Sequence, residues 1–152
     1  MKLAELLIKR KAAKGNLAFL EGRLKANARV QEGEAPQERP EEILTKILEA
    51  IDAIAEYTRI INHANMSTPW RGPEGSYLSD ALCDRDALSK KRRVLAAALE
   101  AIQAERPRFG RMEIKYVPVL EAKYLIAQID AATAQYAELE TRIQQVNWTT
   151  EV

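Results

Sequence analysis

The chain of 152 residues is long enough for one ordinary domain with a buried core. Its 23 Lys and Arg nearly balance its 22 Asp and Glu, so a net charge of +1 excludes a global field that would attract nucleic acid or a membrane surface. The single cysteine excludes an intramolecular disulfide, and the single histidine excludes a multi-histidine metal site.

The composition favours helix over sheet, because the hydrophobic fraction of 47% comes mostly from Ala, Leu and Ile while aromatic residues make up only 6%. No segment approaches the roughly 20 apolar residues that a membrane span requires. The first ten residues lack the cleavage pattern of a signal peptide. We therefore expect a soluble protein of the reducing cytoplasm, with no membrane contact in its native state.

The first predicted helix covers residues 2–28, where seam residues recur at alternating steps of three and four. Its seam consists of Leu3, Leu6, Arg10, Ala13, Leu17, Leu20 and Leu24. The joint after it contains Gly33, Pro36 and Pro40 and cannot continue the helix. Pro40 suits the first turn of the next helix.

The second and third predicted helices cover residues 41–64 and 79–105. The seam of the second consists of Leu44, Ile47, Ile51, Ile54, Thr58 and Ile61. A joint rich in Pro and Gly follows, and Ser79 is the expected N-cap of the third helix. The third seam consists of Ala81, Arg85, Leu88, Arg92, Leu95, Leu99 and Ile102.

The third joint contains Ile114, Tyr116 and Val117, whose strand propensity predicts a short extended segment before the last helix. The fourth predicted helix covers residues 120–147 and has the most regular repeat of the chain. Its seam consists of Leu125, Ile129, Ala132, Tyr136, Leu139, Ile143 and Val146.

Four helices of similar length joined by short connections predict an all-α, single-domain protein over residues 1–152. The simplest arrangement is an antiparallel four-helix bundle, with each helix about 37 Å long. The alternative is a pair of long helical hairpins that complete their core only with another subunit. We expect a homo-oligomer, most simply a dimer.

Three arginines, Arg10, Arg85 and Arg92, fall on the predicted seams. A guanidinium in a core requires an acidic partner, or it faces a cavity. The candidate partners are Asp84, Asp86 and Asp130. The two alternatives are an ion-pair network that sets the helix register and a polar ligand pocket.

The third joint also carries the most suggestive cluster of positive charge. Guanidinium, ammonium and aromatic groups in one joint can bind a phosphate or carboxylate and stack on a planar ring. The cluster consists of Arg106, Arg108, Arg111, Lys115 and Tyr116. Weaker candidates near helix ends are Asn27, Asn62, Asn65 and Trp148. The alternative is a solvated linker whose charges only aid solubility.

Catalytic and cofactor-binding signatures are absent from the sequence. It contains no Gly-rich phosphate loop, HExxH, paired CxxC or GxSxG motif. One histidine cannot supply the two ExxH motifs of a di-iron bundle. We therefore expect no catalytic residues, metal or cofactor, and a protein that is not an enzyme.

Several segments distributed over nearly the whole chain resemble a small bacterial family often labelled septicolysin. They are NARVQEGE at 27–34, IN at 61–62 with Asn65, DAL at 80–82 with RD at 85–86, EIK at 113–115, and RIQQVNWTTE at 142–151. The chain departs from the family pattern at Met112, where a serine is expected, and in a second joint richer in Pro and Gly. The resemblance implies a helical fold without established enzymology, and the label implies a pore-forming cytolysin.

These observations lead to three functional hypotheses. The first is a non-enzymatic homo-oligomeric binding protein that holds a small anionic, nucleotide-like ligand at helix joints and subunit interfaces. The second is a structural or partner-binding scaffold, in which the same residues only cap and pair. The third is the cytolysin that the label implies.

Overall fold

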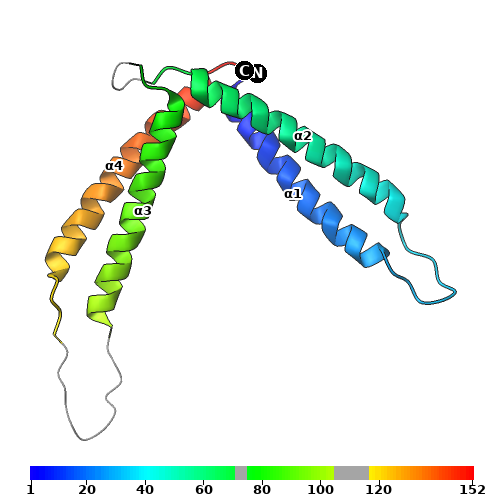
Figure 1. Ribbon diagram of the computed structural model, residues 1–152, viewed down its shortest axis with the longest axis horizontal. Helices are drawn as coiled ribbons and strands as arrows, with labels where there is room; N and C mark the ends of the chain where they lie inside the picture. The colour runs from blue at the N-terminus through cyan, green and yellow to red at the C-terminus, as the bar shows by residue number, and fades with distance from the viewer. Residues whose placement is uncertain (71–74, 105–116) are drawn as a thin grey trace, which may run out of the picture. The chain divides into compact units, whose positions relative to one another are not determined.

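The computed structural model describes residues 1–70, 75–104 and 117–152, and it is all-α over these residues. Its helices are α1 (Leu3–Asn27), α2 (Pro40–Ser67), α3 (Leu78–Gln103) and α4 (Ala122–Thr149) (Figure 1). These described ranges contain no β-strand, and Lys2 and Glu151 form an isolated bridge. The predicted all-α class with four long helices is confirmed.

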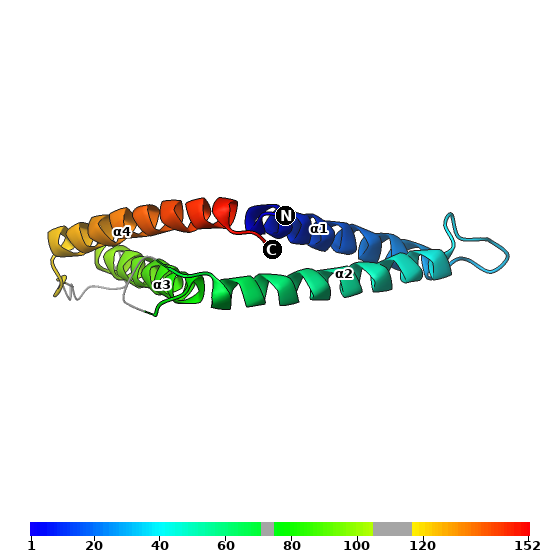
Figure 2. The same cartoon turned by 90° about the horizontal axis from the view of Figure 1, so that it is seen from above.

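The chain divides into two compact units, each built on a helical hairpin. Met1–Pro69 and Gln144–Val152 form the first unit, in which α1 and α2 lie side by side and antiparallel (Figures 1 and 2). Trp70–Ile143 forms the second unit, in which α3 and most of α4 form the other antiparallel pair. The single domain expected from the sequence stays a prediction.

The core of the α1–α2 hairpin is aliphatic. Leu20, Ile43 and Ile47 are between 3% and 6% exposed and pack together, with Leu17 and Leu24 partly buried against them. All three α1 residues of this cluster belong to the predicted seam. Burial of each large aliphatic side chain contributes roughly 1.5–3 kcal/mol, so this cluster is a main source of the hairpin's stability.

The predicted seam of α2 was wrong at two positions. Leu44 and Ile51 are 45% and 44% exposed in this chain, although Ile47 and Ile61 are buried as expected. The hairpin instead buries Ile43, one position before Leu44. The observed seam of α2 therefore differs from the predicted seam by a rotation of the helix of about one residue, roughly 100°.

The connection from α1 to α2 is held by side chains near both of its ends. The Asn27 amide donates to the Arg23 carbonyl at 3.0 Å, and its oxygen accepts the Glu38 backbone N–H at 3.0 Å. Arg23 Nε donates to Glu38 Oε1 at 3.0 Å, and the guanidinium also pairs with Oε2. Gly33 has a φ of +87°, which a residue with a Cβ rarely adopts. These contacts direct the chain back along α1.

The two ends of the chain meet in the first unit. The Leu3 N–H donates to the Thr150 carbonyl at 3.0 Å, and the Val152 N–H donates to the Met1 carbonyl at 2.9 Å. Lys2 Nζ and Glu151 Oε1 form an exposed ion pair at 2.9 Å. Backbone pairing therefore joins the start of α1 to the residues that follow α4.

The α3–α4 hairpin follows the predicted seams of both helices. Leu125, Ala132 and Ile143 of α4 are between 1% and 3% exposed, and Ala81 of α3 is fully buried. The remaining seam residues of α3 and α4 are half-buried. The second hairpin is thus closed along the expected line, but less completely than the first.

Helix ends differ from the predictions by up to three residues. Helix α3 begins one residue earlier than predicted because the Asp80 carboxylate accepts the Tyr77 N–H at 2.7 Å; the N-cap is Tyr77, so the prediction of Ser79 was wrong. Helix α2 continues to Ser67, whose hydroxyl donates to the His63 carbonyl at 2.8 Å. Pro40 lies in the first turn of α2, as predicted, and α2 begins at this residue, one position before the predicted start.

Two further expectations concern the joints and the membrane. The predicted extended segment lies outside the described residues except for Val117, which has no regular structure. Within the described parts of the chain, no helix combines the length and apolar character that a bilayer span demands.

Candidate functional site

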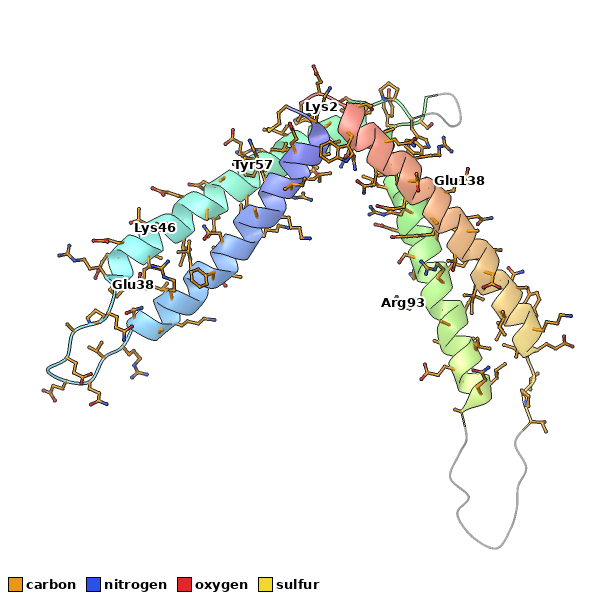
Figure 3. All side chains as sticks on the ribbon, turned by 180° about the vertical axis from the view of Figure 1, so that it is seen from behind. Lys2, Glu38, Lys46, Tyr57, Arg93 and Glu138 are labelled. Atoms are coloured by element: carbon orange, nitrogen blue, oxygen red, sulfur yellow. The ribbon has the colours of Figure 1, made fainter. Side chains whose placement is uncertain are left out.

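A groove of about 520 Å³ runs between α3 and α4 within the second unit. Four of its lining residues come from each helix, and Glu138 can be located on α4 in Figure 3. We name these residues the α3–α4 groove: Asp84, Ala87, Leu88, Lys91, Gln135, Glu138, Leu139 and Arg142. Its volume lies in the range of sites that hold small molecules.

The helical repeat explains which residues line the groove. Leu88 and Leu139 belong to the two seams and supply an apolar floor. Residues three or four positions away lie on the same side of their helix, so Lys91 and Arg142 stand above this floor. Because the helices are antiparallel, Asp84 and Arg142 lie toward one end, and Lys91 and Gln135 toward the other. Each helix contributes one acid and one base.

The seam next to the groove contains an ion pair that was anticipated from the sequence. Arg85 pairs with Asp86 Oδ1 at 2.8 Å and lies 3.8 Å from Glu140 Oε2 on α4. The hydrogen bond that Arg85 donates to the Asp86 carboxylate, and secondarily the charges of Asp86 and Glu140, raise the pKa of Arg85 above its usual value. Arg85 therefore meets carboxylates, and Asp86 is a confirmed partner.

The other two seam arginines have different surroundings. The Arg92 guanidinium lies over the Tyr136 ring at 5.1 Å from its centroid, so α3 and α4 also meet through a cation–π contact. Arg10 is half-buried on the α1 seam. Of the other predicted partners, Asp84 lines the α3–α4 groove, and Asp130 is exposed on α4.

Trp70 adjoins one end of the groove. The guanidinium of Arg142, a groove residue, lies 4.9 Å from the centroid of the Trp70 ring. The Trp70 N–H donates to the Ser76 carbonyl at 2.9 Å, which helps fix the backbone that carries the ring. An aromatic face and a guanidinium thus stand together beside the Asp84 end of the groove.

The structure places the residues predicted to bind a ligand in separate regions. Asn27 is 8% exposed and uses both ends of its amide to hold the α1–α2 connection. On α2, Asn62 is exposed and Asn65 is half-buried, while Trp148 in the last turn of α4 is 54% exposed. The cationic cluster lies outside the described residues: Arg106, Arg108, Arg111, Lys115 and Tyr116. Ligand binding by all of these residues stays a prediction.

Sequence reasoning did not identify the α3–α4 groove. The usable signal was the position of charged residues directly beside two facing seams, such as Lys91 three residues after Leu88 and Arg142 three residues after Leu139. Which flank of a seam faces a groove depends on how the two helices are rotated against each other, and the repeat alone does not specify this.

Other reactive groups do not assemble into a second site in the described ranges. Cys83 is an exposed free thiol on α3, and His63 is exposed on α2. Residues 1–70, 75–104 and 117–152 contain no group of three His, Cys, Asp or Glu side chains placed to hold a metal ion.

The fold and groove define an all-α protein of long helical hairpins with a mixed-charge groove. The chain belongs to a family of unknown function (DUF6847), which it matches over residues 10–152. It is also similar to a functionally unknown conserved protein from Corynebacterium diphtheriae, known from a crystal structure. The two chains share 39% identity with a TM-score of 0.90, over 100% of this chain and 98% of the other. No curated protein matches the sequence.

Proposed function

We propose that this protein is a non-enzymatic, homo-oligomeric helical binding protein of the cytoplasm that holds a small anionic, nucleotide-like ligand in the α3–α4 groove. The groove itself carries the proposal, because it combines an apolar floor with charged side chains from two helices. A few polar groups around an apolar surface are typical of small-molecule sites.

The charges and the aromatic ring at the groove define the class of ligand. Lys91 and Arg142 provide positive charge for a phosphate or carboxylate. Asp84 and Glu138 supply oxygens that accept hydrogen bonds from hydroxyl or amino groups of the same ligand. The Trp70 ring beside Arg142 offers a face on which a planar ring can stack. The cationic joint at residues 106–115, outside the described residues, remains a separate proposed contact for an anion.

Ligand binding is tested first by thermal-shift screening and then by calorimetric titration. Nucleotides and phosphorylated metabolites are added to the full chain, and a rise in the melting temperature identifies a ligand. Lys91→Ala should weaken that ligand about tenfold, because one charged contact is lost. Lys90→Ala is the matched control, since Lys90 is exposed on the same helix and does not line the groove. Equal affinity for both variants would place the ligand elsewhere.

The scaffold hypothesis is the second candidate, and the polar contacts between α3 and α4 favour it. Arg85 with Glu140 and Arg92 with Tyr136 join the two helices without requiring any ligand. In this case no nucleotide or phosphorylated compound changes the melting temperature, and Arg85→Met alters only stability. The two candidates are therefore separated by the same screen.

The cytolysin implied by the family resemblance is the third candidate. Its test is the release of a trapped dye from liposomes by the purified protein at neutral pH. Leakage under native conditions supports this function, whereas leakage confined to denaturing conditions counts against it. No described helix is long and apolar enough to cross a bilayer. That finding does not address other ways of disturbing a membrane, so the leakage measurement is still informative.

A further inference from the structure

Helix α2 carries a second row of aliphatic side chains outside the hairpin seam. Leu44, Leu48 and Ile51 are 45%, 55% and 44% exposed, and the exposed Ala55 continues the row. We name these four residues the α2 stripe. Their spacing of four, three and four places them along one face of the helix over about 16 Å.

The α2 stripe takes no part in the packing of α1 on α2. The seam uses Ile43, Ile47 and Ile61, which are between 3% and 6% exposed. Single exposed apolar side chains are ordinary on protein surfaces, but a contiguous apolar row on one helix face is typical of interaction surfaces. Steps of three and four residues are also the spacing by which two helices interlock.

Charged residues lie beyond both ends of the stripe. Glu41 precedes Leu44 by three positions, and Arg59 follows Ala55 by four. Both residues are exposed, and their helical spacing places them on the same flank of the stripe. The stripe therefore has a negative end and a positive end.

This polarity matches a second copy of α2 in the antiparallel direction. A two-fold axis between residues 49 and 50 places Leu48 opposite Ile51 of the second copy, and Leu44 opposite its Ala55. The same rotation brings Glu41 to within one position of Arg59 of the second copy, at both ends of the contact. A parallel arrangement would instead leave Glu41 and Arg59 of the second copy about 27 Å apart along the helix axes, so that no ion pair could form.

We propose that the α2 stripe is the docking surface for a second copy of this chain, paired antiparallel about a two-fold axis, with Glu41 and Arg59 forming reciprocal ion pairs. The partner is favoured because one face supplies both halves of the contact, apolar row against apolar row and acid against base. A two-fold contact also closes at the dimer and does not propagate into filaments. The inference rests on the homo-oligomeric part of the proposed function.

The first test replaces the centre of the stripe in the full chain. Sedimentation velocity over a range of concentrations measures the dimer dissociation constant of the wild type and of Leu48→Glu. We expect Leu48→Glu to raise that constant about 100-fold or more, because each dimer buries the residue twice. Val94→Glu is the matched control on α3, where Val94 is 58% exposed, and it should leave the constant unchanged. Circular dichroism verifies that both variants retain their helices.

The second test exchanges the two charges. Glu41→Arg alone and Arg59→Glu alone should each weaken the dimer about tenfold, since both ends of the contact then carry like charges. The double variant Glu41→Arg, Arg59→Glu restores opposite charges at both ends and should recover wild-type affinity. Glu49→Arg, an exposed change of the same sign on α2 away from the stripe, is the control.

The outcomes separate this inference from the proposed function. A wild type that sediments as a monomer at all concentrations overturns both the inferred surface and the proposed oligomer. An oligomer that Leu48→Glu does not weaken overturns the surface alone. Failure of the double variant to recover affinity overturns the antiparallel pairing. Ligand binding at Lys91 is measured independently and does not depend on these results.

Discussion

The two hairpins have helices of similar length and the same seam repeat, but they fill their seams differently. The α1–α2 hairpin encloses an aliphatic cluster around Leu20, Ile43 and Ile47. The α3–α4 hairpin places Arg85 and Arg92 on its seam, opposite Glu140 and Tyr136. The same spacing of seam residues therefore supports two kinds of helix–helix contact. The contact is aliphatic in the α1–α2 hairpin and includes polar side chains in the α3–α4 hairpin.

This difference leads us to expect separate roles for the two hairpins. A close-packed aliphatic cluster stabilises without recognising any particular solute. A seam with paired charges has less apolar area to bury, and the groove next to it presents further charged side chains from both helices. We expect the first hairpin to contribute more to stability and the second to contribute more to binding.

The largest expected effect comes from removing a core side chain of the first hairpin. Leu20→Ala should lower the free energy of unfolding by about 2–4 kcal/mol, because Leu20 is 3% exposed. Leu95→Ala, at a half-buried seam position of α3, should cost only about 1 kcal/mol. Urea denaturation followed by circular dichroism measures both values. Equal losses would remove the contrast between the hairpins.

The connection of the first hairpin tests whether polar contacts also stabilise it. Asn27→Ala removes the acceptor of the Glu38 N–H and should cost about 1–2 kcal/mol of unfolding free energy. Asn16→Ala, at an exposed position of the same helix, should change stability by less than about 0.5 kcal/mol. Equal losses of unfolding free energy for both variants would mean that the aliphatic cluster alone, without the Asn27 hydrogen bonds, holds α2 against α1.

A pair of neighbouring arginines tests the polar seam of the second hairpin. Arg92→Ala removes the contact with the Tyr136 ring and should cost about 0.5–1 kcal/mol. Arg93 is exposed on the next position of α3, as Figure 3 shows, and its replacement by alanine should be close to neutral. Thermal unfolding of the two variants gives the difference. A loss as large as that of Leu20→Ala would reverse the assignment of roles.

The smallest expected effect is a dependence of the first hairpin on pH. The hydrogen bond from Arg23, and secondarily its charge, holds the pKa of Glu38 below the usual 4.5. A carboxyl group with a lowered folded pKa stabilises above its unfolded pKa, and this contribution is lost as pH falls through the folded value.

The measurement compares the wild type with Glu38→Gln by thermal unfolding. The wild type should be slightly more stable at about pH 7, and the difference should shrink as pH falls through the lowered pKa of Glu38 in the folded state. A difference that persists at low pH would show that the carboxylate charge is not its source.

The seam positions predicted for α1, α3 and α4 are all buried or half-buried. Helix α2 has two rows of large side chains, one through Ile43 and Ile47 and one through Leu48 and Ile51. A period near 3.6 fits both rows equally well. Only the packing of α1 decides which row becomes the seam, so the prediction failed at Leu44 and Ile51.

The candidate site was less predictable than the fold. The ion pair of Arg85 was anticipated because a guanidinium on a seam requires a partner, and Asp86 supplies it. The α3–α4 groove was missed because its charged residues look like an ordinary solvated face until two helices are placed side by side. Asn27 was predicted as a ligand contact, but the structure shows its amide hydrogen-bonded to the backbone around it.

The sequence by itself determined that the chain forms four long helices, and it located their seams in three of them, because periodic burial is a local property of each segment. The tertiary structure alone decided which row of α2 is buried, where a groove opens and which charges meet. These features depend on the rotation of one helix against its neighbour. That rotation is selected by side-chain packing between segments far apart in the sequence.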